Sequence, residues 1–128
     1  MAELSDYLEN KILDHVLRNV SYTSPTTVYV GLFTTDPTDA GSGTEVSGGS
    51  YARQILSVTT ATAGIVTSSG DVTFPQATAS WGTISHIGLL DAITSGNLLM
   101  HTALTTSRAI ESGDILKISS GNLTATLD

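Results

Sequence analysis

The sequence predicts a mainly β protein: a single-domain antiparallel β-sandwich, jelly-roll-like in its connections, with one N-terminal α-helix. Short runs rich in threonine, valine and isoleucine recur along the chain, separated by stretches of glycine, serine and aspartate. Such runs favour strands, and such separators favour turns. Apolar residues recur at clear helical spacing only in residues 4–20. With 128 residues the chain can bury its own core, so we expect one domain, 1–128, whose sandwich spans 27–127.

The N-terminal segment, residues 4–20, is the predicted helix. Ser5 or Asp6 is suited to cap its start, and Asn19 is suited to end it. We expect this helix to close one end of the sandwich core. The alternative is an arm that docks on a neighbouring subunit. The apolar stripe comprises Leu8, Ile12, Leu13, Val16, Leu17 and Val20.

The first half of the sandwich is predicted from four β-rich runs. Residues 27–35 form a strong strand, and residues 51–61 form a second one. Residues 64–67 and 71–74 are predicted to be short strands on either side of a turn at 68–70. The glycine- and serine-rich loop 36–50 is long for a compact domain, so we interpret it as an exposed contact arm or flap.

A central hairpin is the feature around which we expect the rest to pack. Its strands are residues 81–90 and 97–103, and its turn is residues 91–96, where Asp91, Ser95 and Gly96 favour a bend. Trp81, the single tryptophan, has the largest side chain available for burial. Residues 105–113 are polar and are predicted to link the hairpin to two final strands, 115–118 and 123–127.

Charge and composition exclude several classes of partner. The net charge is −7, and the five basic residues are scattered, so there is no basic stripe for nucleic acid or for an anionic membrane. No cysteine is present, which rules out disulfides and cysteine metal sites. Charged residues make up 13% of the chain, against about 25% in typical domains. A surface poor in charge suits packing against another protein.

The sequence gives no indication of catalysis or of a cofactor. It has no nucleophile elbow of the G-x-S-x-G type and no phosphate-binding loop of the G-x-x-x-x-G-K-[ST] type. Twelve acidic residues are present, but no pair stands out for glycoside chemistry. We therefore predict a protein that is not an enzyme.

Two groups of residues are weak candidates for a metal site. If Leu90 pairs with Asn97 in the hairpin, His86 lies opposite His101, about 5 Å away between Cβ atoms. Zinc needs three or four ligands, and the sequence indicates no third. Hydrogen-bonded histidines at a sheet surface or subunit contact are therefore the favoured interpretation. Calcium in the long loop is disfavoured too, because the spacing of its acids does not match an EF-hand; these acids are Asp36, Asp39 and Glu45.

Contacts with a partner protein are the other candidate role for this region. Tyr51 and Arg53 directly follow the long loop, and these residue types are enriched at the centres of interfaces. An ordinary pair of strand residues is an equally good interpretation. The candidate partner contacts are Asp36, Asp39, Glu45, Tyr51 and Arg53.

Several segments, in order along the chain, resemble a family of short tailed-bacteriophage structural proteins. They include TSPTTVYVGLFTTDPT, GGSYARQ, VTFPQATASWG and SGNLLMHTAL, and together they span nearly the whole chain. Members of that family are described either as tail-fibre proteins or as capsid decoration (cement) proteins. The resemblance implies a virion component, assembled in the host cytoplasm and used in many copies, with no catalytic residues.

On this basis the sequence favours a capsid decoration protein that braces adjacent capsomers on the outer head. Its partners would be the major capsid protein and copies of itself, with no nucleic acid and no membrane. The absence of a long shaft segment supports this prediction over a complete fibre. The alternative is a tail or tail-fibre component with a receptor- or carbohydrate-binding face.

Overall fold

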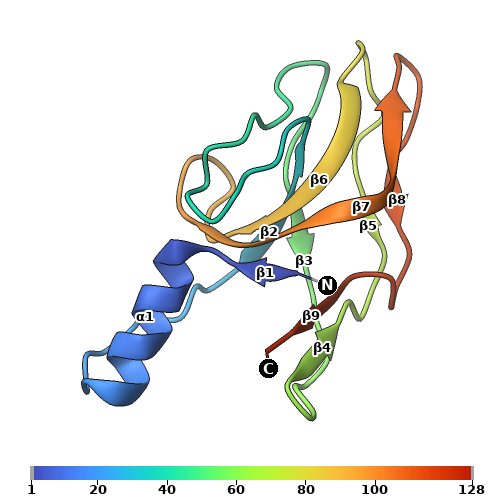
Figure 1. The fold of residues 1–128 in the computed structure, drawn as a ribbon. Helices are drawn as coiled ribbons and strands as arrows, with labels where there is room; N and C mark the ends of the chain where they lie inside the picture. The colour runs from blue at the N-terminus through green and yellow to red at the C-terminus, as the bar shows by residue number, and fades with distance from the viewer. Residues whose placement is uncertain (1, 128) are drawn as a thin grey trace.

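A five-stranded antiparallel sheet, with strand order β1-β7-β6-β2-β3, forms the centre of the protein. The structure is a computed structural model and describes residues 2–127. Residues 2–127 form one helix and nine strands, whose arrangement is shown in Figure 1. Their bounds are β1 (Glu3–Leu4), α1 (Asp6–Leu17), β2 (Val28–Phe33), β3 (Gln54–Leu56), β4 (Ile65–Thr67), β5 (Val72–Thr73), β6 (Gly82–Leu90), β7 (Leu98–Ile110), β8 (Lys117–Ile118) and β9 (Thr124–Thr126).

Two short antiparallel ladders, β4-β9 and β5-β8, complete a sandwich-like arrangement. The main core combines side chains of the large sheet, such as Leu32 and Ile84, with Val72, Phe74 and Leu123 from the short ladders and adjoining segments. The predicted mainly β fold with one helix is confirmed. The pairing of the short strands differs from the expected neighbours around 68–70, because each pairs with a strand from the end of the chain.

The central hairpin is confirmed, but its expected register is wrong. Leu90 pairs with Leu98 instead of Asn97, and irregularities at Leu89/Leu90 and Ile84/His86 shift the pairing along the strands. Residues 105–110 continue β7 instead of forming a link. Across the second irregularity β7 bends sharply, so that its last part runs in a new direction beside β6 (Figure 1). The side chains of residues 105–109 are exposed, which agrees with their mostly polar sequence, whereas Ile110 is buried.

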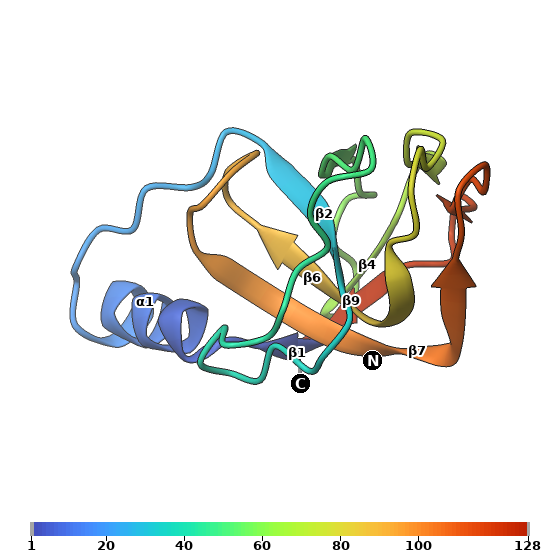
Figure 2. The same ribbon diagram turned by 90° about the horizontal axis from the view of Figure 1, so that it is seen from above.

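α1 does not close the core, so that expectation is wrong. None of its residues is buried, and both ribbon views show it projecting away from the strands (Figures 1 and 2). Only the first turn packs against the core, through Tyr7 and Leu8. The helix is shorter than residues 4–20 because Leu4 belongs to β1. The predicted Ser5 cap and the predicted end at Asn19, which has a φ of 58°, are both confirmed.

The loop of residues 36–50 folds back over the large sheet instead of extending as a flap. Its returning part pairs with the end of β2, where the Val46 N–H donates to the Leu32 carbonyl at 3.0 Å. Pro37 and Val46 are buried, which fixes both ends of the loop. Beneath it lies a second, smaller apolar cluster of Phe33, Leu90 and Leu98.

The expected strand at residues 51–61 is mostly irregular. Only β3, with three residues, pairs with β2, and an isolated bridge joins Val58 to Ser68. Ile55 and Val58 are exposed, so their side chains add no burial that would favour a longer strand. The shortness of β3 leaves Tyr51 and Arg53 outside the strand ladder, where their side chains are free to turn toward the long loop.

Candidate functional site

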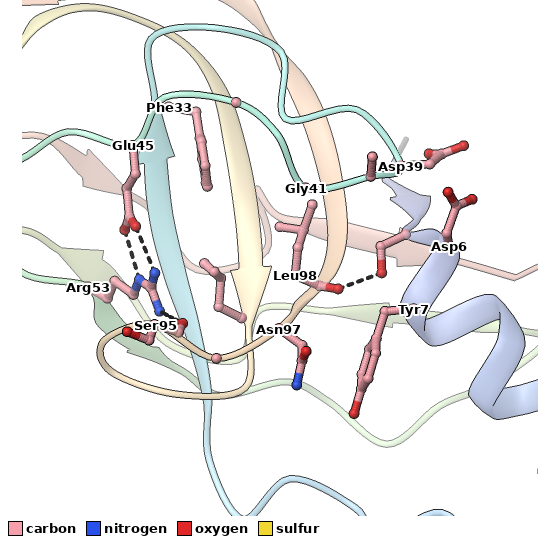
Figure 3. Close-up of a pocket in the computed structure, with 15 residues that line it drawn as sticks. Asp6, Tyr7, Phe33, Asp39, Gly41, Glu45, Arg53, Ser95, Asn97 and Leu98 are labelled. Atoms are coloured by element: carbon pink, nitrogen blue, oxygen red, sulfur yellow. Dashed lines mark hydrogen bonds and ion pairs between the residues drawn. The ribbon is translucent and has the colours of Figure 1, made fainter.

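A groove of about 510 Å³ lies between the long loop, the start of α1 and the turn of the β6-β7 hairpin. Phe33, Leu90 and Leu98 contribute apolar side chains to its lining. Figure 3 shows the Glu45–Arg53 pair at one end of the groove and acidic side chains, Asp6 and Asp39, at the other. The residues predicted as partner contacts therefore lie around one groove or beside it.

The Glu45–Arg53 pair is held by the pairing of the loop with β2. The backbone of Glu45 forms an isolated β-bridge with Phe33 at the end of β2. Its two carboxylate oxygens accept hydrogen bonds from Nε and Nη2 of Arg53, at 2.8 and 2.7 Å. Nη1 of Arg53 donates to the carbonyls of Ala92 and Ser95 at 2.7 and 2.8 Å. The Arg53 side chain is only 8% exposed. Such a forked pair is charge-assisted and geometrically fixed, so it ties the loop to the hairpin turn.

Tyr51 extends this network into the main core. Its hydroxyl donates to Glu45 Oε2 at 2.6 Å and accepts from the Leu32 N–H at 3.0 Å. The ring stacks on Phe74 at 6.2 Å and meets Trp81 edge-on at 5.5 Å. Burial, and then the bond to the Glu45 carboxylate, raise the pKa of Tyr51 above its ordinary value of 10.0.

The network stabilises the fold, and most of the hydrogen-bonding groups of its side chains are used within the chain. Arg53 uses four of its five N–H donors within the chain, and the Glu45 carboxylate raises the pKa of this guanidinium. Trp81 is likewise engaged, since its Nε1–H donates to the Gly49 carbonyl at 2.9 Å. Glu45 and Arg53 line the groove, together with residues of the long loop and of the hairpin turn.

The two histidines do not face each other directly. His86 pairs with Ala103, and His101 pairs with Gly88, two residues along β6. One Asp36 carboxylate oxygen lies 3.9 Å from both rings, at Nε2 of His86 and Nδ1 of His101. His101 Nε2 lies 2.8 Å from Asp39 Oδ1.

The acids of the long loop divide between two environments. Asp36 and Asp39 lie beside the histidines, whereas Glu45 pairs with Arg53. Glu3, which the sequence does not single out, lies opposite His101 in the sheet. No sequence signal could have placed it there, because β1 has two residues and no alternation of its own. The structure thus brings Asp36 and Asp39, but not Glu45, together with the two histidines and Glu3.

A small sandwich-like fold, with its candidate residues engaged in internal contacts, is typical of a structural protein module. The chain matches the model of the family described as Podophage GP4 fiber I protein gp80 over residues 3–126. It therefore belongs to this family of tailed-phage fibre proteins, and the expected kinship with phage structural proteins is confirmed. No curated protein sequence matches the chain. Within residues 2–127, no helix has the length and apolar character needed to cross a membrane.

Proposed function

We propose that this protein is a non-enzymatic tail-fibre component of a podophage virion. The observation that carries the proposal is the match to a podophage fibre family along residues 3–126. It supports the alternative weighed from the sequence better than the capsid decoration role favoured there. The missing shaft segment no longer argues against a fibre, because a fibre can be built from several copies and several proteins.

We further propose that copies of this chain associate through α1. The outward side of this helix exposes Leu13, Val16 and Leu17, whose exposed fractions are 54%, 68% and 74%. A helix of this length is stabilised mainly by packing its apolar side chains against other apolar groups, and an exposed apolar patch marks a surface for such packing. Because these three side chains do not pack against the chain's own core, a second copy is the occupant that fits a many-copy fibre.

Location in the particle tests the role. Intact virions are imaged by cryo-electron microscopy with symmetry averaging of head and tail separately, and the fold in Figure 1 is fitted to both maps. Density for this fold on the tail or its fibres is the expected result. Density on the outer head, at positions shared by adjacent capsomers, would overturn the fibre role and restore the decoration role.

Self-association is tested on the purified chain by analytical ultracentrifugation over a range of concentrations. Val16→Asp places a charge on the exposed stripe and is expected to shift the protein to monomer without loss of fold, since exposed substitutions change stability by about 0.5 kcal/mol or less. Ile115→Asp is the matched control, because Ile115 is 57% exposed but distant from α1 in sequence. Equal association of both variants and the original chain would exclude α1 as the contact.

A further inference from the structure

We propose that Glu3, Asp39 and His101 form a binding site for a divalent transition-metal ion, with zinc as the best match. One ligand atom from each of these three residues lies within 4.8 Å of the other two. Two carboxylates and one imidazole supply the O and N ligands that zinc accepts, with water able to complete a tetrahedron. The proposal is independent of the fibre role and of the contacts made by α1.

The fold fixes all three ligands from different elements. Glu3 of β1 and His101 of β7 are direct partners in an antiparallel pair, so their side chains leave the same face of the sheet. The His101 side chain is 6% exposed, which holds its ring in place. The Asp39 carbonyl accepts from the Asp6 N–H at 2.9 Å, which fixes the loop above that face.

The distances suit a site that closes on an ion with little movement. His101 Nε2 and Asp39 Oδ1 are 2.8 Å apart and share a hydrogen bond. Ligand atoms at zinc bond lengths on a tetrahedron lie about 3.3 Å from each other. An ion could therefore replace the shared proton after a shift of about 0.5 Å between these two atoms.

Asp36 lies close to the second ring nitrogen of His101, about 1 Å beyond hydrogen-bonding distance. Its Oδ1 is 3.9 Å from Nδ1 of His101, the nitrogen that remains when Nε2 binds the ion. Histidine ligands commonly donate their second N–H to a carboxylate, which orients the ring and makes it a better ligand. The same Asp36 oxygen lies 3.9 Å from His86 Nε2, so a second imidazole borders the site.

The charge of the cluster also favours a cation. Three carboxylates, from Glu3, Asp36 and Asp39, gather near two imidazoles, and none of them pairs with a lysine or arginine among residues 2–127. A divalent ion would offset this negative charge. It would also connect β1, β7 and the long loop close to the N-terminal end of α1. This connection would fix the direction in which the helix projects from the sheet.

Titration of tag-free, chelator-treated protein tests the site. Zinc chloride is added in a calorimeter, and cobalt chloride is added in parallel to follow the visible absorption of a tetrahedral site. We expect one ion per chain. At a hundredfold excess over Kd, zinc should raise the Tm by about 10 °C. Magnesium, which prefers octahedral oxygen ligands, should not compete.

The variants separate this site from casual surface binding. Glu3→Gln and Asp39→Asn, both at exposed carboxylates, are expected to abolish stoichiometric binding and the cobalt spectrum. Asp36→Asn should weaken binding about 10- to 100-fold. His15→Ala, on exposed α1, is the control and should bind like the original chain. Circular dichroism of the metal-free variants verifies their fold. Absence of binding, binding that survives Glu3→Gln and Asp39→Asn, or binding lost in His15→Ala would each overturn the proposal.

Discussion

At the scale of single residues, Tyr51 joins the groove to the core. Its hydroxyl bridges a β2 amide and the Glu45 carboxylate, and its ring lies between Phe74 and Trp81. The main core and the long loop therefore share one side chain. Such a buried polar group is costly to leave incomplete, because its partners then lie unpaired in a region with little water.

Tyr51→Phe is expected to lower the free energy of unfolding by about 2 kcal/mol at neutral pH, since it leaves the Leu32 N–H and Glu45 without this partner. The folded state raises the pKa of Tyr51 above 10.0, so its contribution is complete below pH 10 and declines as the pH rises toward the folded value. The difference between the two proteins should therefore shrink above pH 10. Urea unfolding from neutral to alkaline pH measures it.

Tyr7→Phe, in the first turn of α1 and outside this network, serves as the control for general effects of tyrosine ionisation. If Tyr51→Phe unfolds at the same urea concentration as the original chain at neutral pH, the hydroxyl does not stabilise the fold, and its central place in the network is wrong.

The sequence located these residues but not what they contact. Tyr51 and Arg53 are of residue types common in interfaces, and the same size and hydrogen-bonding capacity serve them inside the protein. The acceptor for Arg53 depends on the path of the long loop, which brings back Glu45 beside β2. No local pattern encodes that path, so whether these residues face a partner stays a prediction.

At the scale of elements, Ser5 is the single residue that links β1 to α1. It is 1% exposed; its hydroxyl accepts from the Leu8 N–H at 3.2 Å and donates to the Leu98 carbonyl. One residue thus caps the helix and fastens it to β7. The backbone adds a second link, because the Ser5 N–H donates to the Leu99 carbonyl at 2.9 Å.

Ser5→Ala is expected to lower the free energy of unfolding by about 2 kcal/mol, because it removes the cap and leaves a buried carbonyl unpaired. Far-ultraviolet circular dichroism should show partial loss of helix before global unfolding. Ser24→Ala, at an exposed position after the helix, is the control. Identical helix content and urea midpoints in the two variants would contradict the capping role.

The elements also show where sequence patterns lose their predictive power. The hairpin and its turn were predictable, since dense apolar runs flank a bend at which Gly96 has a φ of 74°. The irregularity at Leu89/Leu90 was not, because it changes the register without changing which residues are apolar. Residues 105–109 have exposed side chains, so their part of β7 carries no alternation for a strand prediction to detect.

At the scale of the whole molecule, stability is distributed unevenly. β2 and β6 lie inside the large sheet, with a strand on either side and with Val30, Leu32 and Ile84 fully buried. α1 has no buried residue, and among residues 2–127 it packs against the core through Tyr7 and Leu8 in its first turn. Regions with few buried apolar contacts open more readily than the core.

Hydrogen–deuterium exchange of the dilute chain should therefore reveal two classes of amide. Those of β2, β6 and the first half of β7 are expected to exchange slowest, at rates set by global unfolding. Those of α1 should exchange faster, and should slow down as copies associate at higher concentration. Protection of α1 equal to that of β6 at low concentration would contradict the weak attachment of the helix.

The edge strands of the large sheet are short, and this decides where backbone groups stay open to another chain. β1, with two residues, forms one edge, and β3, with three, forms the other. Open strand edges act as templates for intermolecular β-pairing and fibrillar aggregation, and short edges offer few free backbone groups for it. β1 covers only a small part of β7, however: residues 103–110 of β7 have β6 as their only strand partner among residues 2–127, so their other side is the edge open to β-pairing with another chain.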